Sequence, residues 1–350
     1  MTKVGGRTRK GVTIVEVAKR AGVSTATVSR VLNNSDKCSP ETRRRVYDAI
    51  AKLNYVPNHS AQSLKRQATQ VIALAIPDIG NPVYVGMAKA VQETASRRGY
   101  RLLLISTEGS LSEEIYAVRS LAQRVVDGLI ICSLTVRQQY LRELERAEAP
   151  VVAIGRLLDE AKVDNVRVDS EAGAVLAVQH LIDQGCRKIA FVNGTLGTVP
   201  ANSRLAGYRR ALFDNGLGFD PELVVDSDFT MMGGYCAMGA LLDAGKDVDA
   251  VFAANDAMAL GVLRRLRESR VRVPEDVVVV GMDDIDEGRI STPTLTTVSL
   301  LAGERGRIAA ELLLDRITGA FRGEWRRVTV TPRLIIRESS VRYMVDTQEG

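Results

Sequence analysis

The segment from residue 24 to residue 33 carries short polar side chains suited to contact with a nucleic acid. Short hydroxyl side chains can reach base edges in a major groove, and Arg30 can bind guanine through two hydrogen bonds or hold a phosphate. Ser24 and Asn33, at the two ends, suit phosphate contacts. A purely structural helix could carry the same pattern, so both interpretations stay open. One face of the expected helix carries Thr25, Thr27, Ser29 and Arg30.

A second group of polar residues follows apolar segments later in the chain. Carboxylates and amides bind hydroxyl groups, arginine donates to ring oxygens or anionic groups, and aromatic rings cover apolar ring faces. Together these side chains suit a polyol such as a sugar. Asp256 has a second interpretation, as an acidic residue that favours the start of a helix. The segments are Asn81–Tyr84, Gly155–Arg156, Asn202–Tyr208, Phe229, Asn255–Asp256 and Asp283–Asp284.

Residues suited to catalysis or metal binding are sparse. The two histidines, His59 and His180, stand alone, which argues against a Ser-His-Asp triad. Gly194 and Gly197 lack the spacing of a phosphate-binding loop and have no accompanying lysine. The cysteines form no CxxC pair, so neither zinc nor a disulfide framework is expected. They are Cys38, Cys132, Cys186 and Cys236. We therefore expect neither an enzyme nor a cofactor.

Three short helices are expected to position the first group of residues. Thr13 and Glu16 form a capping box before an apolar-periodic segment that ends at Gly22. Ser24 caps the second helix, and a turn of Ala-Gly-Val between the two predicts a helix-turn-helix. Ser39 and Pro40 begin a third helix. Its expected buried stripe is Val46, Ile50 and Leu53.

The net charge of +5 is unevenly distributed along the 350 residues. Residues 1–70 carry 14 Lys and Arg against 4 Asp and Glu, a formal charge of +10, so the remaining 280 residues sum to −5. A small basic segment joined to a mildly acidic body predicts a polyanionic partner for that segment. The regular apolar spacing within it argues against a solvated tail.

From Val71 onward, short apolar strands alternate with helical patterns. This alternation predicts an α/β fold with parallel sheets covered by helices, and there are enough strands for two lobes. Ligands of such folds bind at the carboxyl ends of the strands. The expected strands are 71–76, 101–105, 128–132, 151–154, 188–192, 250–253 and 277–280. The expected helices are 84–98, 112–124, 171–184, 202–215, 233–244, 256–269 and 303–318.

At this level of detail the chain resembles the lactose/galactose/purine repressor family of bacterial transcriptional regulators. The resemblance rests on the run VTIVEVAKRAGVSTATVSRVLN, followed by SPETRRRVYDAIAKLNYVPNHSAQSLKR. It implies that the second helix reads the major groove of a double-stranded DNA operator. The implied base-edge residues are Thr25, Ala26, Ser29 and Arg30, and the implied backbone contacts are Thr13, Ser24, Asn33, Ser39, Thr42 and Asn58.

The segment from Asn58 to Arg66 resembles the hinge helix of that family. In the family this helix folds on DNA and inserts a leucine into the minor groove, a position that Leu64 matches. Ala61 would lie beside the wedge and Lys65 near the groove. An exposed leucine in a basic segment can unstack a base step and bend the duplex. The alternative for Leu64 is a buried contact of the linker.

The remainder of the chain, from about residue 71 to 340, resembles the sugar-binding fold shared by these repressors and by periplasmic ribose- and galactose-type receptors. Two departures leave the ligand open. Gly155 replaces an Asp that many sugar-binding members place before the arginine, and Leu300 and Leu301 stand where Gln or Asp is common. The residues implied to line the effector cleft are Tyr84, Arg156, Arg204, Phe229, Asn255 and Asp283.

The resemblance implies a domain order. We expect a helix-turn-helix headpiece at 1–57, a hinge at 58–70 and a two-lobed sensor at 71–345. The first lobe is expected to hold 71–162 and 298–326, and the second 163–297 and 327–340.

The implied function is a homodimeric repressor of carbohydrate-utilisation genes on a palindromic operator, released allosterically by a small sugar-like effector. A nucleoside or purine corepressor, or control by a protein partner, stays open. A periplasmic solute receptor is a lesser alternative, opposed by the basic headpiece. The N-terminus MTKVGGRTRKGVTI lacks the apolar core of a signal peptide, and no apolar run approaches the ~20 residues of a membrane span. We therefore expect a cytoplasmic protein without a membrane partner.

Overall fold

The computed structural model describes residues 12–32, 38–55, 68–135, 138–147, 149–157 and 161–342. The chain forms two compact units, Met1–Thr69 and Gln70–Gly350, which are considered separately below. The division falls at the expected end of the hinge.

The first unit contains the three expected helices, α1 (Ile14–Ala21), α2 (Thr25–Leu32) and α3 (Pro40–Leu53). Thr13 and Glu16 form the capping box, and Gly22 ends α1 in the left-handed conformation with φ 63°. Because a side chain is strained at that φ, glycine suits the turn into α2. The Ser24 hydroxyl accepts a hydrogen bond from the Thr27 N–H at 3.1 Å and so caps α2.

The core of this unit is a single apolar cluster built from one face of each helix. Val28 of α2 and Val46 of α3 are completely buried. Ile50 and Leu53 only pack against the cluster, and Ala49 takes the buried place beside Val46. The α2 residues in the cluster or packed against it are Val28, Val31 and Leu32, so the opposite, outer face of α2 does not take part in the core.

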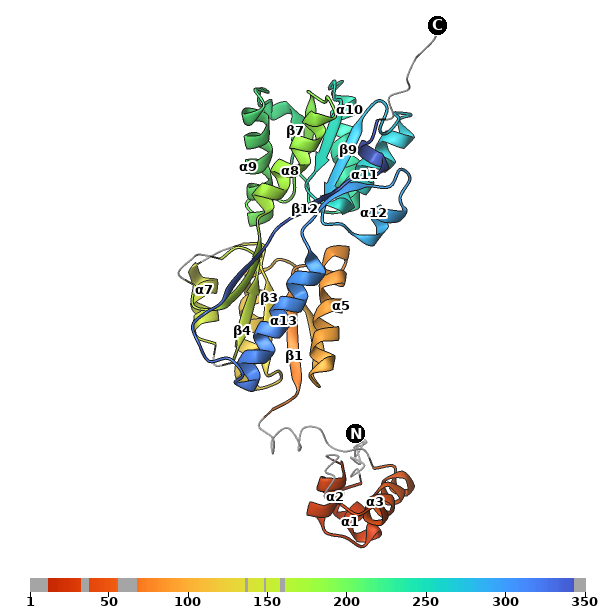
Figure 1. The fold of residues 1–350 in the computed structure, drawn as a ribbon, viewed down its shortest axis with the longest axis vertical. Helices are drawn as coiled ribbons and strands as arrows, with labels where there is room; N and C mark the ends of the chain where they lie inside the picture. Colours follow the sequence, from red (N-terminus) through yellow and green to blue (C-terminus); the bar gives the residue numbers. More distant parts are fainter. Residues whose placement is uncertain are drawn as a thin grey trace, which may run out of the picture. The chain divides into compact units, whose positions relative to one another are not determined.

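The second unit contains two six-stranded sheets, each with helices on both faces (Figure 1). The first sheet has the strand order β11-β5-β4-β3-β1-β2 and is parallel throughout. Its strands are β1 (Val71–Ile76), β2 (Arg101–Ser106), β3 (Gly128–Cys132), β4 (Val151–Ile154), β5 (Asp164–Val168) and β11 (Arg327–Val330). Its helices are α5 (Pro82–Arg97), α6 (Leu111–Arg119), α7 (Gln138–Glu145) and α13 (Ala302–Thr318).

Alternate residues of β1 show how this lobe is layered. Ile72 and Leu74 face a core shared with α5 and α13, whereas Ala73 and Ala75 face a core shared with α6 and α7. Side chains of a strand point alternately to opposite faces, so a continuous apolar run such as VIALAI is needed when both faces are covered.

The second sheet has the strand order β12-β10-β9-β8-β6-β7. Its strands are β6 (Ile189–Val192), β7 (Val224–Val225), β8 (Ala250–Ala253), β9 (Val278–Met282), β10 (Thr296–Ser299) and β12 (Arg333–Ile335). Its helices are α8 (Ser170–Asp183), α9 (Val199–Asp214), α10 (Met231–Asp243), α11 (Asp256–Glu268) and α12 (Asp286–Ile290). β12 runs antiparallel to β10, which departs from the all-parallel expectation.

Three connections join the two lobes: β5 to α8, β10 to α13, and β11 to β12. Because β5 and β11 pair in the first sheet, the first lobe extends to residue 168 and again to residue 330. The expected boundaries, which placed 163–168 and 327–330 in the second lobe, are therefore wrong. The expectation failed because polar residues alternate with valine in β5 (DNVRV) and β11 (RVTV), so neither segment has the continuous apolar run of the expected strands.

Asp164 anchors the far end of the first lobe. Its carboxylate is fully buried and accepts hydrogen bonds from Arg316 Nε and Nη2 at 3.0 and 2.8 Å. It also accepts from the Arg326 N–H at 2.7 Å and from Arg326 Nη2 at 3.0 Å. Burial raises the pKa of Asp164, but these donors outweigh it and hold the pKa below its usual value. The carboxylate thus ties β5 to α13 and to the segment before β11.

Within the described part of the chain, no helix has both the length and the apolar run required to cross a bilayer.

Candidate functional sites

The outer face of α2 is the candidate recognition surface. Thr25, Ala26 and Arg30 are exposed, and Ser29 is half-buried, while Val28 and Val31 anchor the opposite face. The four residues expected at base edges therefore share the face of α2 that leaves the core. The half-buried Thr27 instead contacts Ser24, with 2.9 Å between the two hydroxyl oxygens.

Four of the expected backbone-contact residues lie at helix starts. The hydroxyls of Thr13, Ser24 and Ser39 accept hydrogen bonds from the first turns of α1, α2 and α3, and Thr42 accepts from Ser39 at 2.9 Å. Helix N-termini attract phosphate because their N–H groups and dipole favour negative charge. The other expected DNA-binding residues lie outside the described residues. These are Asn33, Asn58, Ala61, Leu64 and Lys65.

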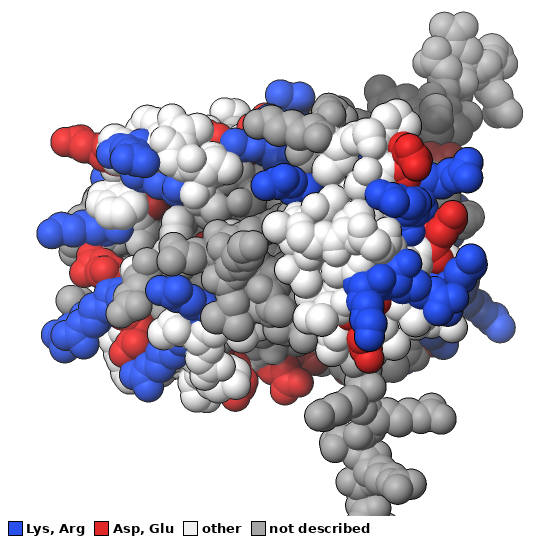
Figure 2. Space-filling model, turned by 90° about the horizontal axis from the view of Figure 1, so that it is seen from below, with Lys and Arg blue, Asp and Glu red and all other residues white. Residues whose placement is uncertain are grey.

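Each of the three helices of this unit carries exposed basic side chains. Lys and Arg are prominent on the face of the molecule shown in Figure 2, with Asp and Glu among them. In the described part of the headpiece, the exposed basic residues are Lys19, Arg20, Arg30, Arg44, Arg45 and Lys52.

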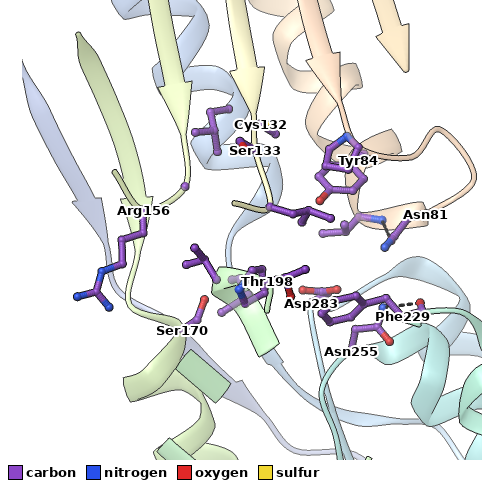
Figure 3. Close-up of a pocket in the computed structure, with 18 of the residues that line it drawn as sticks. Asn81, Tyr84, Cys132, Ser133, Arg156, Ser170, Thr198, Phe229, Asn255 and Asp283 are labelled. Carbon is purple, nitrogen blue, oxygen red and sulfur yellow. Dashed lines mark hydrogen bonds between the residues drawn. The ribbon is translucent and has the colours of Figure 1, made fainter. Parts of the chain in front are cut away.

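A cavity of about 1010 Å³ lies where the carboxyl ends of the strands of both lobes meet. The first lobe contributes Tyr84, Cys132 and Arg156, and the second contributes Asp283 (Figure 3). Arg204 of the second lobe also borders the cavity. All six residues expected to line the effector cleft border this cavity.

Arg204 and Asp283 form the charged centre of the second-lobe wall. Arg204 Nη2 lies 3.7 Å from a carboxylate oxygen of Asp283, and Nη1 donates to the Ala254 carbonyl at 2.5 Å. The guanidinium carbon Cζ of Arg204 lies over the Phe229 ring, 5.7 Å from the centroid of the ring. Burial raises the pKa of Asp283 to about 6, with Arg204 and Arg305 acting in the opposite direction. Near neutral pH this carboxylate can accept hydrogen bonds from ligand hydroxyls.

The backbone that presents Asp283 is strained. Asp283 and Asp284 follow β9 with φ values of 127° and 61°, both in the region that favours glycine. Asp283 N–H donates to the Val298 carbonyl at 2.9 Å, and Asp284 accepts from Arg337 at 2.6 Å and from Arg289 at 3.1 Å. These bonds hold the turn, so the Asp283 carboxylate is fixed toward the cavity.

Asn255 acts mainly as a brace. Its side-chain carbonyl caps α11 by accepting from the Met258 N–H at 2.9 Å, and its amide donates to the Phe229 carbonyl at 2.9 Å. Asn255 borders the cavity, but these two bonds make its clearest role the placement of Phe229, which has φ 66°.

Gly194 forms the seat of the Phe229 ring. A Cβ atom at Gly194 would lie 1.9 Å from Phe229 Cζ, which is far inside van der Waals contact. Gly194, which lacks the sequence context of a phosphate-binding loop, is thus explained by the close approach of an aromatic ring. Its absent side chain lets Phe229 lie at the cavity wall.

Replacing Gly194 by Ala should lower the free energy of unfolding by about 1–3 kcal/mol, because the Phe229 ring must leave its seat and strain its neighbours. Thermal unfolding of the full chain measures the change. Gly218→Ala is the matched control, since a Cβ at Gly218 meets nothing within 4 Å. Equal stability of the two variants would contradict this role of Gly194.

Tyr84 and Arg156 differ in how they face the cavity. Tyr84 directs its hydroxyl into it from the start of α5, and burial raises the pKa of this phenol, which stays a neutral donor (Figure 3). Arg156 is exposed at the edge, with its guanidinium directed away from Tyr84 and Asp283 (Figure 3).

Asp256 lies behind the cavity wall. It is the first residue of α11, as expected for an acidic helix start. Its carboxylate also accepts from the Thr297 hydroxyl at 2.6 Å and from the Ile285 N–H at 3.0 Å. Burial, together with the nearby Asp283, raises the pKa of Asp256 to about 7. Asp256 therefore joins α11 to β10 and to the strained turn.

The sequence reasoning did not single out one buried, charged residue of the cavity. Arg305, in the first turns of α13, borders the cavity and is 8% exposed. The available signal was an arginine in a helix whose neighbouring positions Ala309 and Leu312 are buried and apolar. Leu300, noted as an apolar departure, also borders the cavity.

The fold and the cavity define a class of protein: a two-lobed sensor of the periplasmic-binding type joined to a helix-turn-helix unit. Residues 13–58 match the model of bacterial regulatory proteins of the lacI family, and residues 178–340 match a periplasmic binding protein-like domain.

Individual relatives agree with both matches. The HTH-type transcriptional regulator CelR of Thermobifida fusca is 40% identical over 338 residues, which cover 95% of this chain and 99% of that protein. The structure of a CelR–cellobiose complex covers 94% of this chain and 100% of its own, at 40% identity and a TM-score of 0.71. The lac repressor dimer bound to operator and the anti-inducer ONPF covers 95% and 100%, at 30% identity and a TM-score of 0.83.

The chain therefore belongs to the lacI family of bacterial regulatory proteins and is a transcriptional regulator.

Proposed function

We propose that this chain is a sequence-specific repressor whose affinity for a palindromic operator is set by a small sugar-like effector. The observation that carries the proposal is the presence, in one chain, of a basic helix-turn-helix with a free recognition face and a sensor cavity lined by polar and aromatic groups. The CelR–cellobiose complex, a relative with a bound sugar, supports the sugar-like class.

In the proposed complex, α2 lies in the major groove and the starts of the helices face phosphates. Arg30 reads a guanine or holds a phosphate, and Thr25, Ala26 and Ser29 contact base edges. Thr13, Ser24, Ser39 and Thr42 bind the DNA backbone, together with Asn33 and Asn58. The exposure of the α2 residues supports this assignment, because buried side chains cannot reach a groove.

The hinge is proposed to act through a wedge. Leu64, with Ala61 beside it and Lys65 near the groove, inserts between base pairs at the operator centre and bends the duplex. The proposal rests on the resemblance of residues 58–66 to the hinge helix of the family. The match to the family model covers residues 13–58 and so ends at the first residue of this segment.

Changing Leu64 to Ala should weaken operator binding by about 10- to 100-fold, since partial unstacking by the wedge permits further contacts. Fluorescence anisotropy with operator DNA measures it. Thermal unfolding of the sensor serves as the control and should stay unchanged. Undiminished affinity would remove Leu64 from the wedge role.

A homodimer is proposed because an apolar surface of the first lobe is left open. β2 is the edge strand of its sheet and carries the exposed side chains of Leu103 and Leu104. Val85, Tyr116 and Val125 are also exposed on this lobe. Exposed apolar side chains mark association surfaces where they form a contiguous patch. A second copy, with its own headpiece, would supply the other half of a palindromic operator.

The effector is proposed to change the angle between the lobes and so the spacing of the two hinges. A coupling free energy of roughly 1–3 kcal/mol between the sites is typical of such regulators. We propose that the effector is an inducer, so that its binding releases the chain from the operator. A nucleoside or purine corepressor, or a protein partner, is the alternative.

Two measurements test the function together. Genomic fragments selected by the purified chain should contain a palindrome, and sugars, nucleosides and purines should be screened for an upward shift in Tm. A stabilising compound should then release the chain from the selected DNA. Tighter binding with that compound would establish corepression, and absence of any selected palindrome would contradict the proposed function.

A further inference from the structure

Arg305 is a buried cation without a counter-charge of its own. Its side chain borders the effector cavity, and its Nε is enclosed without a hydrogen-bond partner among the described residues. Arg204 lies within 4 Å of Asp283, whereas Arg305 makes no ion pair of that length in the described part of the chain. The Nε atom has therefore lost contact with water without gaining a hydrogen bond.

Such an arrangement is costly in the empty protein. Desolvation acts against the charged form and lowers the pKa of Arg305, yet arginine stays protonated at any physiological pH. Buried cations are normally paired or hydrogen-bonded, because an unpaired one destabilises the fold. A cation held open on a cavity wall suits a charge that arrives with the ligand.

The charges around Arg305 favour an anion at this end of the cavity. Arg204, Asp283 and Tyr84 border the same cavity as Arg305, and each of them acts electrostatically on its guanidinium. Two guanidinium groups thus face one carboxylate. The other acidic residues that border the cavity are exposed and screened by water, or lie near a second cation. Asp78, Glu108, Asp169 and Asp228 are exposed, and the half-buried Glu171 lies 4.0 Å from Arg210.

The start of α13 adds to this positive field. No side chain caps the helix at Leu301, and Arg305 follows within its first turns. The dipole of a helix places partial positive charge at its N-terminus. Tyr84, a neutral phenol, can donate one further hydrogen bond.

We propose that the effector is an acidic sugar derivative, whose carboxylate or phosphate monoester lies against Arg305 and Arg204. Asp283 then accepts hydrogen bonds from hydroxyls of the same molecule, and Phe229 covers an apolar ring face. This inference rests on the proposed effector role of the cavity and narrows the ligand to an anionic class. Two kinds of anion share the chemistry, an acidic sugar and a sugar phosphate.

The test compares neutral and anionic forms of the same sugars on the full chain. The probes are glucose, glucuronate, gluconate and glucose 6-phosphate, their galactose and ribose counterparts, and inorganic phosphate, all at constant ionic strength. An anionic probe should raise Tm by about 5 °C at roughly 100-fold its Kd. The matching neutral sugar should shift Tm less. Comparing the Tm shifts produced by the sugar carboxylates with those produced by the sugar phosphates distinguishes an acidic sugar from a sugar phosphate.

Variants assign the effect to Arg305. Arg305→Met should weaken binding of the anionic probe about 10- to 100-fold, because a charge-assisted hydrogen bond is lost, and should leave the Tm of the empty protein unchanged or higher. Arg305→Lys should retain part of the affinity. Arg307→Met is the matched control, since Arg307 lies on the same helix but pairs with Glu311 at 2.9 Å.

The outcomes separate this inference from the proposed function. Equal affinity of the wild type and Arg305→Met for every anionic probe, or no anionic probe that stabilises the wild type above its neutral counterpart, overturns the inference. A large loss of Tm in empty Arg305→Met would assign Arg305 a structural role and also overturn it. Binding of the empty chain to palindromic DNA is measured separately, so a regulator that answers to a neutral sugar refutes only the anionic effector.

Discussion

Operator binding should weaken by about 10³-fold or more when salt rises from about 50 to 200 mM. The first 70 residues carry a formal charge of +10, and two copies would bring twice that charge to the duplex. Each neutralised phosphate releases condensed counterions, and about six contacts suffice for a loss of this size. The measurement is the operator Kd over a salt series, plotted as log K against log salt.

A single variant calibrates the slope. Arg44→Gln removes one exposed basic residue of α3 that lies outside the proposed base-reading face. If Arg44 meets a phosphate in each copy of the dimer, the slope should fall by about 2. Arg210→Gln, on the exposed surface of α9 in the sensor, should leave the slope unchanged. A slope near zero for the wild type would refute the headpiece as a DNA-binding unit.

Changing Asp164 to Asn should lower the free energy of unfolding by about 3–5 kcal/mol. The substitution removes the one buried carboxylate shared by Arg316 and Arg326. Arg326 keeps its ion pair with Asp315 at 3.2 Å, whereas Arg316 keeps the carbonyls of Gly323 and Glu324 as acceptors. Asp247→Asn is the control, because Asp247 is 80% exposed and its pair with Lys188 is screened by water. Chemical denaturation measures both, and a cost below about 1 kcal/mol for Asp164→Asn would contradict the anchoring role.

The pH dependence of this difference has a defined sign. Because its hydrogen bonds with Arg316 and Arg326 hold the folded pKa of Asp164 below its usual value, the carboxylate stabilises the fold above the unfolded pKa, about 3.9. The stabilisation is lost as pH falls through the lower folded pKa. The gap between wild type and Asp164→Asn should thus be constant from about pH 6 to 8 and narrow below about pH 4.

The helices of the headpiece were predictable because their signals are local. Capping at Thr13, the stop at Gly22 and the start at Ser39 each depend on residues within four positions, and all three are confirmed. The apolar strands of the two sheets were predictable for the same reason. β10 was missed because its sequence TTVS is polar, although Thr296 and Thr297 are buried with their hydroxyls hydrogen-bonded.

Parts of the site could not be read from the sequence because they depend on tertiary contacts. The seat of Phe229 on Gly194 joins residues 35 positions apart, and the brace from Asn255 joins two further segments. Arg305 looked like an ordinary helical arginine until α13 was placed against the cavity. The resemblance supplied the six cleft residues. The structure was needed to show that Asn255 mainly holds Phe229 and α11 in place, whereas Asp283 presents its carboxylate to the cavity.

The connections between the lobes have a consequence for biosynthesis. The core of the first lobe takes Ala309, Leu313 and Leu314 from α13, and its edge strand β11 lies at residues 327–330. A nascent chain that has completed β1 to β5 still lacks these pieces until its last 50 or so residues leave the ribosome. The apolar face formed by Ile72 and Leu74 must therefore wait while most of the second lobe, from α8 to β10, is synthesised. The lobe that begins first is completed only near the end of synthesis, and a chain cut short after residue 300 should need chaperone protection at its amino-terminal half.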